Sequence, residues 1–521
     1  MTLDHSNIAN EVDRRKTFAI ISHPDAGKTT LTESLLFLGG AIRLAGSIKA
    51  RKTNKYATSD WMEMERKRGI SVTSSVLQFS YQDYKINILD TPGHQDFSED
   101  TYRTLTAADS ALMLIDMAKG VEAQTIKLFE VCRMQGIPIF TFINKLDRQG
   151  KEPLELLDEI EKVLGIESFP VSWPIDVGAE SYGLYNRSSQ KLAIHEHGQN
   201  FKELNVEEIE KDEVANNLNQ EIELLDVAGE NFDLDKVNKG LLTPVYFGSA
   251  INGFGVESFF QDFIKFASPP AKRKSNIGHI DPKNKEFSGF VFKIQANMNP
   301  DHRDRIAFLR VCSGKFQRNM TVNHVRTGKQ VKLSQPRQFM SQDRDIVEEA
   351  YPGDIIGIFD PGIYQIGDTL TETGSFEFKQ LPSFTPEHFA KVTAKQAIKH
   401  KQFHKGLSQL TEEGAVQVYK DPQTEETILG VVGELQFEVF QYRLKHEYGI
   451  EVNLNRLPYK TARWLKGSEF EFMSQSRDMI VKDENNNTVV LFENEFSLNW
   501  AKEKNPSVTF YRLEEFNELF V

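Results

Sequence analysis

The sequence lacks several features that would assign it to a specialised class of protein. It has two cysteines, Cys132 and Cys312, among 521 residues, which is too few for a disulfide framework or a four-cysteine zinc site. No apolar run reaches the ~18 residues that span a bilayer, and the first residues show no basic segment followed by an apolar one. The 33 glycines and 19 prolines are scattered, unlike those of a collagen or low-complexity chain. These absences predict a globular protein of the reducing cytoplasm, without a membrane partner.

Excess positive charge is also missing, because the formal net charge is −13. A general nucleic-acid binder gains affinity by neutralising phosphates, so free DNA is not an expected partner. The imbalance is largely local, since residues 202–236 carry 12 acidic and three basic residues, and we expect a solvated helical surface there. Basic clusters at residues 66–68 and 391–405 leave a local contact with a polyanion open.

The chain is long enough for about three or four domains, and the first is expected at residues 1–275. Short apolar runs alternate there with amphipathic stretches, which is typical of a mostly parallel sheet with helices on both faces. The runs that predict buried strands are 18–21, 86–89, 111–115, 137–143 and 245–247. Helices are expected at 31–38 and 153–164.

The pattern changes after the first domain. Residues 280–382 contain short alternating segments separated by turn sequences, which predicts a small β-barrel. Residues 385–521 mix strand-like segments with helical ones at 399–413 and 433–447, which predicts an α+β domain. The expected fold is therefore an α/β domain, then a β-barrel, then an α+β domain.

A phosphate-binding loop is indicated by Ser-His-Pro-Asp-Ala-Gly-Lys-Thr at residues 22–29, directly after the first strand. It matches the G-x-x-x-x-G-K-[ST] pattern except that Ser22 replaces the first glycine. Such a loop needs inward backbone N–H groups, a lysine for the β/γ-phosphates and a hydroxyl for Mg²⁺. Gly27, Lys28 and Thr29 supply these three elements. The predicted phosphate-binding residues of this loop are Ser22, His23, Pro24, Asp25, Ala26, Gly27, Lys28 and Thr29.

Three further motifs follow in order, each at the end of an expected strand. Residues 90–94, Asp-Thr-Pro-Gly-His, provide a carboxylate for the Mg²⁺ shell and a glycine N–H for the γ-phosphate. Residues 144–147, Asn-Lys-Leu-Asp, provide a carboxylate that can accept both N–H groups of a guanine edge, which adenine does not offer. Residues 248–250, Gly-Ser-Ala, follow the last strand. Four motifs in this order predict a P-loop GTPase that binds GTP and GDP.

With these motifs, the chain resembles the translation-factor GTPases. The stretch at residues 65–71 is similar to their first switch, and the histidine after Gly93 points to the same group. Within it the chain most resembles the bacterial class II peptide chain release factors, the release factor 3 family. The stretches that carry this narrower resemblance are residues 21–30, 59–65, 97–104, 290–298 and 461–464.

The resemblance implies a role for each motif residue. Thr29 and Ser71 would ligate Mg²⁺, with Asp90 acting on the metal through water, although most translation factors have threonine where Ser71 stands. The second motif would contact the phosphates with Asp90, Thr91, Pro92, Gly93 and His94. The guanine pocket would be formed by Asn144, Lys145, Leu146, Asp147, Ser249 and Ala250.

The same resemblance implies the reaction and its partners. His94 would be the catalytic residue that positions the attacking water, with ribosomal RNA of the large subunit as the activator. The GTP form would eject a class I release factor from the ribosome after peptide release, and hydrolysis would free this protein, a cytoplasmic monomer. Translocases of the superfamily carry two further domains, for which 521 residues leave no room.

Two alternatives stay open at this stage. The chain could be another ribosome-bound GTPase, such as a stress or ribosome-protection factor, although those usually have more domains. It could also be a metabolic GTP-dependent enzyme, which would need a second substrate pocket. No further catalytic motif follows residue 270. A histidine that merely caps the next segment is the structural alternative for His94.

Overall fold

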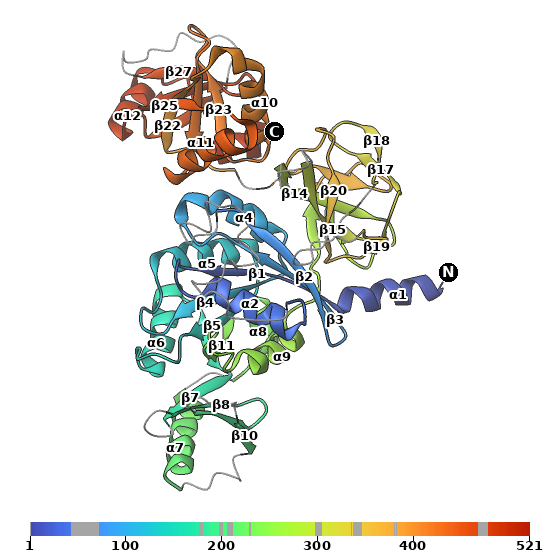
Figure 1. The fold of residues 1–521 in the computed structure, drawn as a ribbon, viewed down its shortest axis with the longest axis vertical. Helices are drawn as coiled ribbons and strands as arrows, with labels where there is room; N and C mark the ends of the chain where they lie inside the picture. The colour runs from blue at the N-terminus through green and yellow to red at the C-terminus, as the bar shows by residue number, and fades with distance from the viewer. Residues whose placement is uncertain are drawn as a thin grey trace.

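The computed structural model describes three consecutive regions, each built on its own sheet (Figure 1). The described residues are 2–42, 72–176, 181–196, 202–205, 212–228, 231–296, 305–334, 336, 346–379, 381, 383–466 and 478–520. No helix in these ranges has the length and apolar character to cross a bilayer.

The first region contains a seven-stranded sheet in which only the edge strand β2 runs antiparallel to its neighbour. In sheet order the strands are β2 (Ser75–Tyr81), β3 (Tyr84–Asp90), β1 (Arg15–Ser22), β4 (Ser110–Asp116), β5 (Ile139–Asn144), β11 (Leu242–Phe247) and β6 (Glu167–Pro170). The five strands expected from the sequence are confirmed. Their apolar runs are buried because helices cover the sheet on both faces.

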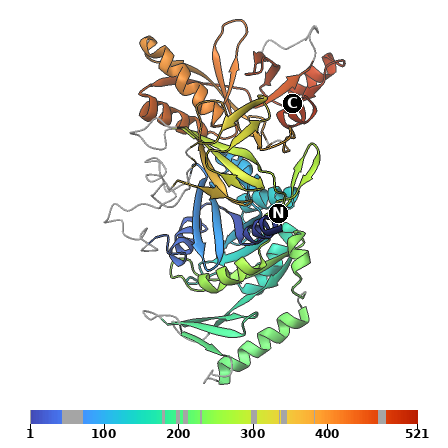
Figure 2. The same cartoon turned by 90° about the vertical axis from the view of Figure 1, so that its right-hand side faces the viewer.

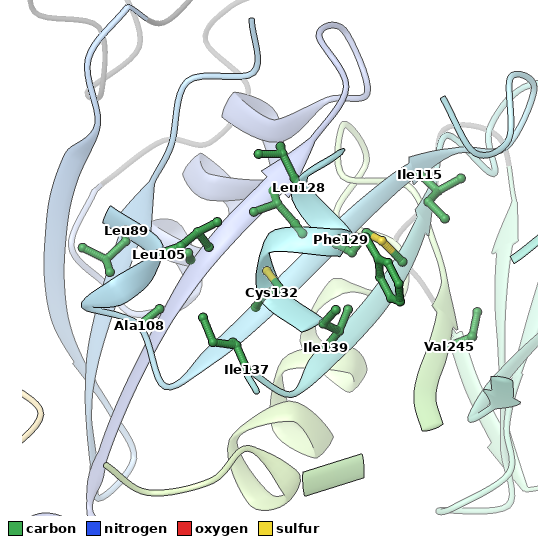
Figure 3. Packing of buried hydrophobic residues seen from close by; sticks show 14 of the residues in the cluster. Leu89, Leu105, Ala108, Ile115, Leu128, Phe129, Cys132, Ile137, Ile139 and Val245 are labelled. Atoms are coloured by element: carbon green, nitrogen blue, oxygen red, sulfur yellow. The ribbon is translucent and has the colours of Figure 1, made fainter. Parts of the chain in front are cut away.

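Two groups of helices cover this sheet. Buried side chains of α4 (Ser98–Thr106), α5 (Ala123–Gln135) and α6 (Pro153–Leu164) pack on one face, where α5 contributes Leu128 and Phe129 (Figure 3). The opposite face packs against α2 (Lys28–Leu38), α8 (Leu234–Asn238) and α9 (Val256–Phe266). Burying each large apolar side chain contributes roughly 1.5–3 kcal/mol, so the two layers hold the sheet and its edge loops in place. Helix α1 (Thr2–Asp13) precedes the sheet.

A second, antiparallel sheet is inserted after β6, and this insertion was not expected. It has the strand order β10 (Lys202–Asn205), β9 (Lys191–Glu196), β8 (Ser181–Asn186) and β7 (Ser172–Asp176), and α7 (Asp212–Ala228) follows it. Figures 1 and 2 show it projecting from the end of the first region. A solvated helical surface was expected for the acidic stretch at 202–236. That prediction is wrong for residues 202–205, which pair with β9.

A hairpin of β12 (Arg273–Ser275) and β13 (Gly278–Ile280) leads into the second region. Its main sheet has the order β18 (Lys329–Lys332), β17 (Thr321–His324), β21 (Thr369–Thr371), β14 (Ser288–Ala296), β15 (Arg305–Ser313) and β20 (Ile355–Phe359). A small pair, β16 (Phe316–Gln317) and β19 (Glu349–Ala350), completes it. The sheet encloses one apolar cluster, as expected for a small barrel.

The third region is built on one eight-stranded antiparallel sheet. Its order is β25 (Val452–Leu457), β22 (His388–Ala394), β24 (Thr427–Val431), β23 (Gln417–Lys420), β27 (Met479–Lys482), β28 (Thr488–Phe492), β26 (Thr461–Leu465) and β29 (Phe510–Tyr511). The accompanying helices are η4 (Ala397–Lys399), α10 (His400–Glu412), α11 (Leu435–Tyr448), α12 (Glu495–Lys504) and α13 (Leu513–Phe520). Helices α10 and α11 lie close to the predicted ranges, which confirms the α+β prediction.

Candidate functional site

The predicted motifs meet at one edge of the first sheet. Strands β1, β3, β4, β5 and β11 run parallel, so their carboxyl ends lie at the same edge. Each predicted motif follows one of these ends, and ligands of open parallel sheets bind at that edge.

The loop between β1 and α2 has the geometry of an anion site. Gly27 is the N-cap of α2 with φ 99°, a conformation that favours glycine. A Cβ at this position would lie 2.3 Å from Nδ2 of Asn144, so the loop also needs glycine for space. The backbone N–H groups at the start of α2 are therefore available to a phosphate.

Two charged groups are buried beside this loop. Lys28 is 8% exposed and forms an ion pair with Asp90, which is 1% exposed at the end of β3. Asp90 Oδ2 and the Ser22 hydroxyl are buried without a hydrogen bond in the described part of the chain. Buried polar atoms normally have partners, so these two atoms fit a site whose ligand brings polar groups of its own.

The same residues fit the Mg²⁺ ion that such a ligand carries. Thr29 lies in the first turn of α2, next to Lys28. The described residues contain no cluster of three or more histidine, cysteine or acidic side chains that could hold a metal. Mg²⁺ at a nucleotide site is usually held by one or two protein groups, phosphates and waters, so Thr29 and Asp90 are the described residues that would hold it. Ser71, the other predicted ligand, lies outside the described residues.

Asn144 connects the phosphate loop to the last motif. Its amide nitrogen donates to the Ala26 carbonyl at 2.9 Å, and its amide oxygen accepts from the Ala250 N–H at 2.9 Å. The side chain is 3% exposed, so both bonds are shielded from water. Asn144 therefore holds two loops together, a role that its motif alone did not reveal.

The predicted base pocket is built around Asp147 and Lys145. The Ser249 hydroxyl donates to Asp147 Oδ1 at 2.5 Å and orients that carboxylate. Lys145, with φ 74°, sends Nζ to the Asp25 carbonyl and to Asp116 Oδ2, both at 2.6 Å. The Lys145 stem is thereby stretched towards the phosphate loop, where its methylenes can cover a flat ring.

Asp116 is a site residue that the sequence analysis missed. Burial pushes the pKa of its carboxyl upward, but hydrogen bonds from Lys145 and from the Ala118 amide outweigh burial and hold that pKa below its ordinary value. The residue stays ionised and fixes Lys145. Its position at the end of β4, in line with the other motifs, was the signal that could have identified it.

Other predicted residues have mainly structural contacts. The Thr91 hydroxyl donates to the Ile20 carbonyl at 2.7 Å, and the Pro92 carbonyl accepts from Thr101 at 3.2 Å. The Leu146 N–H donates to the Gly248 carbonyl at 3.1 Å. These bonds hold the motif loops against the sheet.

Gly93 and His94 lie beside the phosphate loop. A Cβ on Gly93 would be 3.5 Å from Pro24 N and 3.6 Å from the Ser22 carbonyl oxygen, so the two segments are in contact. His94 is the N-cap of η2 (Gln95–Phe97), and its Nδ1 accepts from the Asp96 N–H at 3.2 Å. His94 therefore does cap the next segment, as the structural alternative expected. Its Nε2 is the ring nitrogen that stays available to a water.

Family models match the three regions in order. Residues 13–269 match "Elongation factor Tu GTP binding domain", residues 286–373 match "Elongation factor G domain 2", and residues 378–502 match "Class II release factor RF3, C-terminal domain". A crystal structure of a protein from Thermus thermophilus superposes with a TM-score of 0.71 at 23% identity, covering 90% of this chain and 72% of that one. This last similarity supports the fold alone.

Curated relatives match over nearly the whole length. Peptide chain release factor 3 of Symbiobacterium thermophilum is 56% identical over 520 residues, which is 97% of this chain and 98% of the relative. The proteins of the same name from Listeria innocua and Streptococcus mutans are each 55% identical and cover 96% of this chain, with 98% and 99% of the relatives matched. The chain therefore belongs to the peptide chain release factor 3 family.

Proposed function

We propose that this translation-termination GTPase uses GTP to remove class I release factors from the ribosome after peptide release. In its GTP form the protein binds the terminated ribosome and displaces the class I factor. Hydrolysis to GDP and phosphate then releases the protein itself. It acts as a monomer in the cytoplasm, with the ribosome, including large-subunit RNA, as its partner.

The observation that carries this proposal is the base pocket at the end of β5. The Ser249 hydroxyl holds the carboxylate of Asp147, and a guanine would offer this carboxylate two N–H donors. Such charge-assisted bonds are stronger than neutral ones. Adenine presents an acceptor where guanine presents a donor, so this pocket supports GTP over ATP. The near full-length relatives support termination over other uses of GTP.

Hydrolysis of the third phosphate requires positioning and charge stabilisation more than covalent chemistry. Lys28 would contact the β/γ-phosphates from the start of α2. Thr29 and Ser71 would hold Mg²⁺ with their hydroxyls, and Asp90 would act on the ion through water. When bound, Mg²⁺ neutralises charge that develops on the phosphate oxygens. His94 orients the attacking water through Nε2, and Gly93 lets the backbone approach the γ-phosphate.

The chain also offers a route from phosphate to partner. Segments that contact a γ-phosphate can order or release a neighbouring element when that phosphate is lost. The segment after Gly93 continues into η2 and α4, which contact the second and third regions. Loss of the γ-phosphate would therefore change the contacts of η2 and α4 with the second and third regions.

His94→Ala tests the hydrolysis step. We expect GTP affinity to stay near the wild-type value, because Lys28, the N–H groups of the phosphate loop and Asp147 would still hold the nucleotide. Ribosome-stimulated hydrolysis should fall by roughly 10²-fold or more, a usual effect of removing a general acid–base or positioning group. Both are measured by equilibrium titration and by phosphate release on purified ribosomes. Unchanged stimulated turnover would contradict the assignment.

A further inference from the structure

The short helix η2 lies between the predicted catalytic histidine and the third region of the chain. Asp96, at its centre, donates its N–H to His94 Nδ1 at 3.2 Å, and its carboxylate Oδ1 lies 3.4 Å from the same nitrogen. The carboxylate of the same residue accepts a hydrogen bond at 2.7 Å from the N–H of Leu435, which is the first residue of α11. One residue thus contacts both the His94 ring and a helix 339 residues further along the chain.

The contact at α11 has the form of a helix cap supplied by another region. N-terminal N–H groups of a helix need an acceptor, and a carboxylate there also interacts favourably with the helix dipole. Asp96 has a side chain 12% exposed, so water competes little for this bond. Figure 1 shows α11 at the side of the third region that faces α4.

Space around this contact is also restricted. A Cβ on Gly433 would lie 2.3 Å from Cβ and Cγ of Asp96 and 2.4 Å from its Cα. Any larger residue at position 433 must therefore push η2 away. Gly433 does not have a left-handed φ, so an alanine there would act through this contact and not through backbone strain.

An apolar cluster holds the other end of η2. Phe97 and Val439 are 5% and 6% exposed and pack together with Val72, which directly follows the predicted first switch. Leu435 and Tyr442 of α11 border this cluster. The third region consequently holds η2 at both Asp96 and Phe97.

We propose that Asp96 is a positioning residue for hydrolysis. Helix α11 fixes the carboxylate of Asp96, and the backbone N–H of Asp96 holds the His94 ring beside the third phosphate. Docking of the third region thereby sets the rate of GTP hydrolysis. The inference rests on the role proposed for His94. It goes further because it assigns control of that histidine to residues that never touch the nucleotide.

The test compares Asp96→Ala, Asp96→Asn and Gly433→Ala in ribosome-stimulated hydrolysis by the full-length protein. Misplacing a catalytic group by about 1 Å can lower the rate 10²-fold, so we expect kcat to fall by roughly 10- to 100-fold in Asp96→Ala and Gly433→Ala. Asp96→Asn keeps an oxygen acceptor for Leu435 and should retain most of kcat. The KM for ribosomes and the affinity for GTP should stay unchanged in all three.

Glu434→Ala is the matched control at the same helix terminus. Its side chain pairs with His388 at 3.1 Å and Arg456 at 2.9 Å, within its own region, so a merely structural disturbance of α11 would appear here too. We expect wild-type kcat for this variant. Equal losses in Glu434→Ala and Asp96→Ala would overturn the positioning role.

His94→Ala, alone and combined with Asp96→Ala, separates this inference from the proposed function. If Asp96 acts through His94, the double variant should be no slower than His94→Ala. Loss of hydrolysis in His94→Ala with wild-type kcat in Asp96→Ala and Gly433→Ala would overturn the positioning role and leave the proposed function intact. Retained hydrolysis in His94→Ala would overturn both the positioning role of Asp96 and the catalytic role of His94.

Discussion

At the scale of single residues, the proposed preference for guanine nucleotides depends on the carboxylate of Asp147. The bond from Ser249 fixes one oxygen, at 2.5 Å, and the side chain is 19% exposed. The type of residue and its place after β5 were predictable from the sequence, because an Asn-Lys-x-Asp motif follows a buried apolar run. The bond that orients the carboxylate was not predictable, since it joins the loops that follow two different strands, β5 and β11.

Asp147→Asn should lower GTP affinity by roughly 10²-fold or more. The amide NH₂ would face a donor of guanine, and each lost bond to a charged group is worth about 1.5–3 kcal/mol. Xanthosine triphosphate, which has a carbonyl where guanine has its amino group, should bind better to the variant than to the wild type. Equilibrium titration with both nucleotides measures this. Lys162→Ala, which removes an exposed side chain of α6 that pairs with Asp158 at 2.7 Å, is the control and should bind GTP normally.

Lys16, in β1, is a buried cation with consequences for stability. Burial lowers the pKa of its ammonium from 10.5 to about 8, against the opposing effect of Asp13 and Asp109. Between about pH 8 and 10.5 the unfolded chain therefore binds more protons at this residue than the folded chain, and rising pH favours the folded state. Below pH 8 the buried charge destabilises the protein.

Lys16→Met should accordingly raise stability most at pH 7. The pKa difference corresponds to about 3 kcal/mol, less the hydrogen bond that Nζ donates to the Ala267 carbonyl. The advantage of the variant should shrink as the pH rises from 8 towards 10.5. Urea unfolding of both proteins at several pH values measures it. A constant difference across this range would show that Lys16 is not buried as a cation.

At the scale of elements, the sequence predicted what depends on local pattern. Buried apolar runs identified β1, β3, β4, β5 and β11, and with them the edge where the motifs meet. The inserted sheet was missed because its strands carry no such runs. Strand β10 is an example. Its sequence, Lys-Glu-Leu-Asn, has one apolar residue, and it forms a strand because it pairs with β9.

The loop between β1 and α2 should be intolerant of a side chain at Gly27. Gly27→Ala combines a φ of 99° with a Cβ that would meet Asn144 at 2.3 Å, so the loop must move and its N–H groups leave their positions. We expect GTP affinity to fall at least about tenfold, which corresponds to 1.4 kcal/mol. Circular dichroism should remain that of the wild type. Unchanged affinity would contradict the role of this loop.

At the scale of the whole molecule, the first two regions are joined through buried charges. Asp109, which immediately precedes β4, accepts from Arg273 at 2.8 Å and from Arg310 of β15. The side chains of Asp109 and Arg310 are 0% and 1% exposed. No local pattern predicts this cluster, because its members come from separate regions and belong to no motif. The contact of Asp96 with α11 escaped prediction for the same reason.

Asp109→Ala should destabilise this junction by about 3–5 kcal/mol, because it leaves two arginines without their buried partner. We expect a lower melting temperature and faster proteolysis between the first and second regions. The control is Asp158→Ala, which removes an ion pair with Lys162. The two side chains are 57% and 74% exposed, so this substitution should change stability by less than about 1 kcal/mol. Similar effects of the two substitutions would contradict a rigid junction.

GTP-dependent removal of class I release factors is measured by following a labelled class I factor on terminated ribosomes. Adding the wild-type protein with GTP should speed dissociation of the label, and Asp147→Asn with GTP should not. ATP in place of GTP should leave dissociation at its spontaneous rate. If ATP served as well as GTP, or if the label stayed bound with GTP, this protein would not be a GTP-driven factor that removes class I release factors.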